Sequence, residues 1–181
     1  KIVFFEHTWK LQDSTLNLSI DKKAISFDNP VIFSSKEQEV WLNGGISPDP
    51  KTTLKIGVDD MNINVISHFV KREIEGVLNV NAVISGVYDT LVANSDITIA
   101  DIKLDGYAIG TLTAFSYWDV IKNNLAIDGI LKQKDKEVLD LNGTYGIRNK
   151  ENPIVFTIKP FLKLKIIITP LIINKINRII I

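Results

Sequence analysis

The stretch "TLKIGVDDMNINVISHFVKREIEGVLNVNAVIS", residues 53–85, decides the fold because apolar and polar residues alternate on both sides of a short helix-like piece. Successive residues of a β-strand point to opposite faces, so this alternation predicts strands with one apolar and one polar face. The residues expected on the apolar face are Leu54, Ile56, Val58, Ile63, Val65, Leu78, Val80, Ala82 and Ile84.

The second half of the chain repeats the alternation in "NLAIDGIL", "LDLNGTY", "IVFTI" and "LKLKIII", with turn residues such as "DG" and "RNKEN" between the segments. The residues expected on its apolar face are Leu125, Ile127, Leu139, Leu141, Phe156, Ile158 and Leu164. In "DITIADIKLDG" the apolar parity changes at Ala100–Asp101, which predicts a bulge or a tight turn. The chain is therefore expected to be predominantly all-β.

A short helix is predicted over residues 67–75, with Ser67 as its N-cap and Gly76 as its C-terminal cap. Its apolar stripe would consist of Ile66, Phe69, Val70 and Ile74, which recur at three- and four-residue spacing. A helix of about two turns is marginal alone in water, so we expect it to dock on the end of the sheet's apolar face. A partial copy is expected over residues 170–177.

An internal repeat supports an elongated architecture. "VWLNGGIS" at Val40 aligns with "LDLNGTYG" at Leu139, and similar strand patterns follow each. We therefore divide the chain into two partial repeats, about residues 20–100 and 101–181. Because the chain begins "KIVFFEHTW" and stops at "NRIII", we expect a segment of a longer protein, with any amino-terminal membrane anchor outside it.

Composition argues against several classes of function. The 181 residues carry 21 basic and 21 acidic side chains, mixed along the chain, so no basic surface for nucleic acid is expected. The absence of cysteine excludes disulfides and thiolate metal sites. The two histidines, His7 and His68, are not at metal-ligand spacing, and no nucleophile elbow, Walker loop or dinucleotide fingerprint occurs. We expect no enzyme, no metal and no cofactor.

The remaining residues that could carry chemistry have simpler explanations. Asp59 and Asp60 are adjacent, and adjacent strand residues point apart, so a turn between two strands is favoured over a catalytic carboxylate pair. Trp41, Tyr117 and Trp118 could line a ligand wall, but core packing or a sheet edge is the commoner use of such residues.

The order of these motifs resembles the carboxy-terminal region of the TamB family, the translocation and assembly module proteins related to AsmA and to bridge-like lipid transfer proteins. The resemblance rests on "ISHFVKREIEGVLNVNAVISG", "ITIADIKLDGYAIGTL", "NLAIDGIL" and "LDLNGTYG". In that family a docked helix precedes a strand with the pattern G.L.....I.G, which Gly76, Leu78, Ile84 and Gly86 match. The resemblance covers roughly residues 20–181.

This resemblance implies a long sheet curled into an open groove, a β-taco, with an apolar inside and a polar outside. It also implies a periplasmic protein that is anchored in the inner membrane by its amino-terminal part and reaches an outer-membrane barrel of the TamA type. The expected partners are phospholipid and that barrel, and the expected roles are lipid transport to the outer membrane and outer-membrane protein assembly.

Two other interpretations stay open at this point. The same alternation builds the closed core of a β-sandwich or barrel, which would have a binding role only. A third possibility is a structural scaffold that offers strand edges to barrel proteins.

Two tripeptides resemble the Asp-Ser/Thr-apolar signal for O-glycosylation in Bacteroidota, whose envelope proteins share this composition rich in Ile, Asn and Lys. The acceptors would be Ser14 and Thr90.

Overall fold

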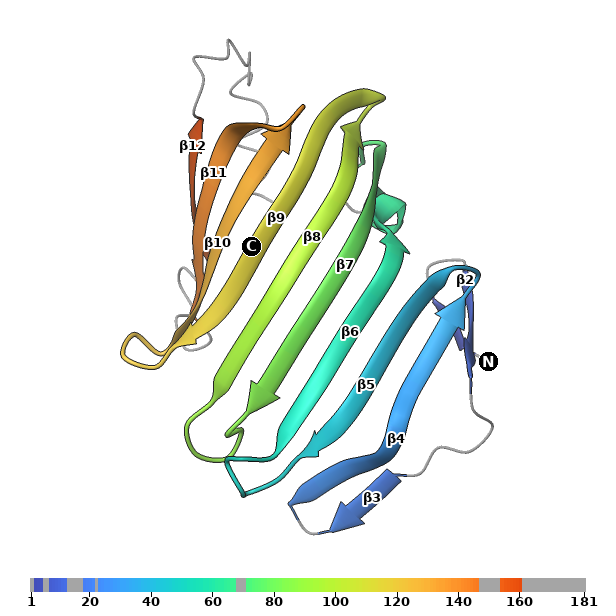
Figure 1. Cartoon of the computed structure of the whole chain (residues 1–181), viewed down its shortest axis with the longest axis vertical. Helices are drawn as coiled ribbons and strands as arrows, with labels where there is room; N and C mark the ends of the chain where they lie inside the picture. The colour runs from blue at the N-terminus through green and yellow to red at the C-terminus, as the bar shows by residue number, and fades with distance from the viewer. Residues whose placement is uncertain are drawn as a thin grey trace.

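The strands of this chain form one antiparallel sheet (Figure 1). The computed structural model describes residues 2–4, 7–12, 18–21, 23–67, 71–146 and 154–160. The strands are β1 (Ile2–Phe4), β2 (His7–Leu11), β3 (Leu18–Asp21), β4 (Ala24–Ser35), β5 (Gln38–Ile46), β6 (Thr53–Asn62), β7 (Ile74–Ser85), β8 (Val92–Leu104), β9 (Tyr107–Asp119), β10 (Asn124–Gln133), β11 (Lys136–Tyr145) and β12 (Ile154–Pro160). One four-residue 3-10 helix, η1 (Ile63–Ile66), follows β6.

The sheet is an open meander. From β4 to β12 each strand pairs with the next one along the chain, and β2 and β3 pair with different halves of β4. In the described part of the chain, β1 pairs only with β2 and β12 only with β11, so the sheet does not close on itself. Figure 1 shows the middle strands face-on and the strands at both ends turned edge-on, so the sheet curls. This confirms the predicted all-β curled sheet and excludes a closed barrel for these strands.

Short turns explain why the meander forms. Asp105 and Gly106 join β8 to β9 with φ of 50° and 79°, and Lys134 and Asp135 join β10 to β11 with φ of 49° and 63°. Two successive residues with positive φ make the tight hairpin turns whose twist matches that of paired strands. The sequence "DG" indicated the first of these turns.

Strands β6 and β8 each bulge at an aspartate with a left-handed backbone, Asp60 and Asp101, with φ of 53° and 51°. A regular strand would place Asp60 on the apolar face and Met61 on the polar face. Val58 pairs with Val80, and Met61, three residues further along β6, pairs with Leu78, only two residues from Val80 on β7. The extra residue in β6 therefore keeps Met61 on the apolar side. In β8 the same arrangement keeps Ile102 on the apolar side. The irregularity predicted at this point of β8 is confirmed as a bulge.

The turn predicted at Asp59–Asp60 is wrong. Both residues lie inside the continuous strand β6, and the bulge takes the place of the turn. The Asp59 carboxylate accepts a hydrogen bond of 2.8 Å from Trp41 Nε1. The Asp60 backbone N–H donates to Asn79 Oδ1 at 3.1 Å.

The helix predicted over residues 67–75 is wrong at its carboxy-terminal end, because residues 71–73 are turn or irregular and Ile74 begins a strand, whereas Ser67 is helical. The 3-10 turn η1 lies just before Ser67, so the predicted strand residues Ile63 and Val65 lie in η1, together with Ile66. Ile74 is the first residue of strand β7 and not part of a helix. Phe69 and Val70, like the partial copy at 170–177, lie outside the described residues.

Local hydrogen bonds account for this difference. Asn62 caps η1 by accepting the backbone N–H of Asn64 at 2.9 Å. Ser67 Oγ accepts the backbone N–H of Ile74 at 3.0 Å and lies 3.3 Å from its carbonyl oxygen, which fixes the start of β7. Ile63 docks η1 on the sheet, and its side chain is buried. It packs over Gly76 of β7, where a Cβ atom would lie 3.1 Å from Ile63 Cδ1.

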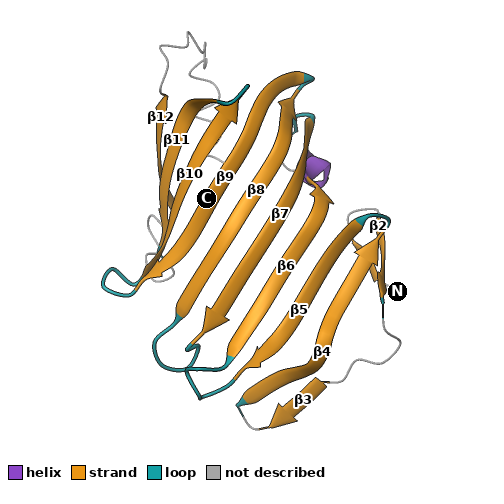
Figure 2. Cartoon of the chain, in the orientation of Figure 1, coloured by secondary structure: helices purple, strands orange, loops and turns teal. Residues whose placement is uncertain are grey.

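The sheet has no second layer among the described elements. The buried apolar residues are only Trp9, Val31, Ile63, Ala114 and Ala126, and no large described side chain is completely buried. Figure 2 shows strands over nearly all of the described chain and a single helical turn at the end of β6. No described helix has the length and apolar character to cross a membrane.

Candidate functional site

The candidate site is the apolar face of the sheet, which the strand register assembles. Val80 lies opposite Val58 on one side and Ile97 on the other. By the same register, the predicted apolar residues within the described strands all lie on one face: Leu54, Ile56, Val58, Leu78, Val80, Ala82, Ile84, Leu125, Ile127, Leu139, Leu141, Phe156 and Ile158. Leu164 lies outside the described residues.

One transverse row on this face is apolar at every position. It crosses β2 and then β4 to β12, and its members are Leu11, Phe33, Val40, Val58, Val80, Ile97, Ala114, Gly129, Leu141 and Ile158. Neighbouring strands lie about 4.8 Å apart, so nine spacings make a row of about 43 Å. The hydrocarbon core of a bilayer is about 30 Å thick, so one leaflet's acyl chains span about half of that. The row is therefore longer than one leaflet of a bilayer is thick.

Parallel rows widen this surface. One row consists of Val31, Leu42, Ile56, Ala82, Ser95, Ser116, Ile127, Gly143 and Phe156. A shorter row consists of Leu78, Ile99, Leu112, Leu131, Leu139 and Pro160. The sequence prediction missed Phe33, Val40, Leu42, Ile97 and Ile99, although "VIFSS", "EVWLNG" and "DITIA" show the same alternation.

Ser95 and Ser116 are polar groups within the apolar rows. Their Oγ atoms lie 2.7 Å apart and hydrogen-bond to each other, and Ser116 is buried. Because the two hydroxyls satisfy one another, they present little unpaired polarity to a ligand on this face.

The apolar face differs in accessibility along the sheet. At β4 and β5 it is most enclosed, where Val31, Ser35 and Gln38 are buried. Gln38 Oε1 accepts the backbone N–H of Asn62 at 3.1 Å, which ties this end to β6. At β12 it is most open, since Phe156 is 49% and Ile158 58% exposed. Most other side chains on this face are half-buried, so a ligand could reach them.

Glycine–aromatic pairs shape both faces. A Cβ on Gly143 would lie 2.4 Å from the ring of Phe156, so the ring lies directly over this glycine on the apolar face. On the polar face, a Cβ on Gly57 would lie 1.9 Å from the ring of Trp41. Trp41 and Tyr117 therefore face away from the apolar rows, whereas Trp118, opposite Leu125, belongs to the apolar face.

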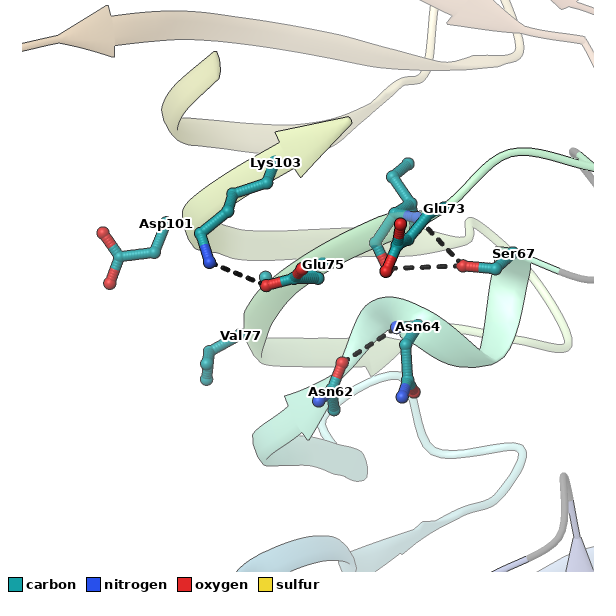
Figure 3. A pocket seen from close by; sticks show the side chains of 10 residues that line it. Asn62, Asn64, Ser67, Glu73, Glu75, Val77, Asp101 and Lys103 are labelled. Carbon is teal, nitrogen blue, oxygen red and sulfur yellow. Dashed lines mark hydrogen bonds and ion pairs between the residues drawn. The ribbon is translucent and has the colours of Figure 1, made fainter. Parts of the chain in front are cut away.

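A cavity of about 450 Å³ lies beside η1, where β6 and β8 end and β7 begins (Figure 3). Glu75 and Lys103 pair across β7 and β8 with 2.8 Å between Oε2 and Nζ, and this hydrogen bond raises the pKa of Lys103. In Figure 3, Asp101 lies on the far side of Lys103, away from Ser67. Glu75 and Lys103 thus bind each other on the polar face, and their ion pair links β7 to β8 beside the cavity.

A second ion pair reinforces this end of the sheet. Arg72 binds Asp105 through its Nε atom at 2.6 Å and through Nη2, and the Glu73 backbone N–H donates to the same carboxylate at 3.2 Å. The hydrogen bond from Arg72 lowers the pKa of Asp105 below its ordinary value. The pair joins the residues before β7 to the β8–β9 turn.

The described residues contain no group of three His, Asp or Glu side chains that could hold a metal ion. The side chain of His7 and all of His68 lie outside the description. Thr90 is exposed in the β7–β8 loop, and Ser14 lies outside the described residues, so glycosylation of both stays a prediction.

Comparison with known proteins gives no relative from which a role could be transferred. No family model matches the chain, and neither a curated protein nor a solved structure matches it.

Proposed function

We propose that the apolar face binds the acyl chains of phospholipids and lets them pass along the sheet, across the strands. The observation that carries this proposal is the unbroken transverse row of ten apolar residues from Leu11 to Ile158. Acyl chains need a continuous apolar wall without polar specificity, and each Å² of apolar surface removed from water contributes about 25 cal/mol.

The single-layer architecture supports this role. A sheet with one apolar face normally covers that face with another layer, and no described element does so here. Large exposed apolar surfaces on soluble domains are typically binding sites. An open, curled sheet can exchange its ligand along its whole length, which a closed core cannot.

The wider setting of this function follows from the resemblance to TamB. We place the chain in the periplasm, as part of a longer protein that is anchored in the inner membrane and reaches a TamA-like barrel. In that setting the groove carries phospholipid toward the outer membrane and supports outer-membrane protein assembly. No catalytic step and no cofactor is part of the proposal.

A photo-crosslinking amino acid placed at Val80, in the full-length protein in cells, tests the assignment of the face. Val80 belongs to the apolar row, while Asn81 and Val83 on the same strand lie on the polar face. Lipid adducts detected by mass spectrometry at Val80, and absent at the other two positions, would support the proposal. Adducts to outer-membrane protein strands instead of lipid would favour the scaffold role, and no adduct at Val80 in folded protein would overturn the lipid groove.

A further inference from the structure

The polar face carries one exposed aromatic pair, Phe115 and Tyr117 on β9. Their ring centroids are 6.1 Å apart with an angle of 20° between the planes. Phe115 is 50% and Tyr117 40% exposed, although β9 is paired on both sides. Three of the four residues directly opposite them are Asn94, Asp96 and Asp128, and the fourth is Ala126, so the two rings form an apolar patch among mostly polar neighbours.

Two carboxylates flank this patch. Asp96 on β8 lies directly opposite Phe115, and Asp128 on β10 lies opposite it on the other side. Directly opposite side chains on one face of an antiparallel pair have their Cβ atoms about 4.5–5.5 Å apart. The ring of Phe115 therefore lies between two acidic groups, one on each neighbouring strand.

No basic side chain lies directly opposite or diagonal to either carboxylate in the described strands. The register places Asn81 next to Asp96 and Asn142 next to Asp128, beyond the aromatic ring. The diagonal neighbours of the two carboxylates on this face are Asn79, Val83, Thr113, Tyr117, Asp140 and Thr144. The ion pairs between described residues involve other carboxylates: Glu75, Asp105, Asp119 and Glu137. The patch thus combines two exposed aromatic rings with two carboxylates that have no ion-pair partner among the described residues.

We propose that this surface, made of Asp96, Phe115, Tyr117 and Asp128, binds an arginine side chain of a partner polypeptide. A cation over an aromatic ring is attracted by the ring's negative face. A guanidinium is planar and projects its N–H donors within its plane, so one group stacked on Phe115 can donate to a carboxylate on either side. An ammonium offers no such plane, which is why the arrangement favours arginine over lysine.

This docking surface is independent of the proposed lipid groove. Phe115 alternates with Ala114 and Ser116, which belong to the apolar rows, so the two surfaces lie on opposite faces of β9. A partner bound there would leave the apolar face open to its ligand. Loss of one function would not remove the other.

The test uses the full chain, labelled with ¹⁵N, and three acetylated tripeptide amides: Gly-Arg-Gly, Gly-Lys-Gly and Gly-citrulline-Gly. Citrulline has the shape of arginine without its charge. At low ionic strength, where surface charges are least screened, Gly-Arg-Gly should shift amide signals of residues 94–98, 113–117 and 126–130. The shifts should be several-fold smaller with lysine and absent with citrulline.

Variants assign the effect to the residues. Asp96→Asn combined with Asp128→Asn should reduce the shift per peptide added at least fivefold, and Phe115→Leu should reduce it several-fold. Glu137→Gln, which removes an acidic group in β11, should leave it unchanged. The spectrum itself reports whether each variant is folded. Equal shifts with citrulline, shifts elsewhere on the chain, or larger shifts of the same amides by chitotriose would overturn the proposal, the last by assigning the surface to sugars.

Discussion

Substituting Val80 with Asp separates an open apolar face from a covered core. Val80 lies in the centre of the apolar row and is half-buried by its neighbours, with no element above it in the described sheet. Val83 is the matched control, because it is the same residue type on the same strand, faces the polar side and is 39% exposed. Lys55 lies directly opposite Val83 and Asp96 lies diagonal to it, so a new carboxylate there meets one charge of each sign.

The expected magnitudes differ between stability and lipid binding. Complete burial of a valine contributes about 1.5–3 kcal/mol, so losing half of it should lower the free energy of unfolding by about 1 kcal/mol. The new carboxylate stays hydrated as long as the face is open. Once an acyl chain covers it, the charge must be desolvated or protonated at a cost of several kcal/mol. Lipid affinity should then fall at least tenfold, since each 1.4 kcal/mol is a factor of ten.

Urea unfolding and binding of a fluorescent phospholipid measure the two quantities on the same preparations. Val83→Asp should change the free energy of unfolding by less than about 0.5 kcal/mol and leave lipid binding unchanged. A loss of stability above about 4 kcal/mol in Val80→Asp without lipid would mean that the face is already covered as a core. Equal lipid affinities for the two variants would refute the assignment of the groove to this face.

Three further predictions concern the polar face and the end of the sheet beside η1. Gly57→Ala should lower the free energy of unfolding by about 2–4 kcal/mol in urea, because the new Cβ displaces the ring of Trp41 and breaks its hydrogen bond. Ser67→Ala removes the hydrogen bonds at the start of β7 and should speed hydrogen exchange of its first amides, with exchange in β10 unchanged. Because Arg72 lowers the pKa of Asp105, their contact contributes stability above the unfolded-state pKa of about 3.9 and is lost as the pH falls through the lower folded value. An NMR titration should return the pKa of Asp105 toward its ordinary value in Arg72→Gln, and an unchanged pKa would refute this cause.

The two faces of the sheet could be predicted from the sequence because alternation is a local property. Leu54, Ile56 and Val58 alternate with polar residues or glycine, and the hairpin meander then places every such set on the same side. The bulge at Asp101 was also readable, since the parity of the isoleucines changes there. These features depend only on the period of two and on short turns.

The end of the predicted helix could not be predicted in the same way. The spacing of Ile66 and Ile74 is compatible with one helix, but Ile74 pairs with Leu104 on β8, about 30 residues away along the chain. That pairing and the Ser67 side chain begin a strand where local propensity favoured a helix. The proposed docking surface around Phe115 was missed for a related reason: its two carboxylates come from separate strands.

The bulges at Asp60 and Asp101 keep one face of the sheet apolar although they interrupt the regular strand pairing. Asp60 and Asp101 each adopt a left-handed backbone conformation, which costs on the order of 1 kcal/mol or more for a residue with a side chain. A regular β6 would turn Met61 to the polar face, and a regular β8 would do the same to Ile102. The bulges instead keep Met61 and Ile102 on the apolar face, so this face stays continuous to the ends of β6 and β8. The proposed binding of acyl chains requires this continuity.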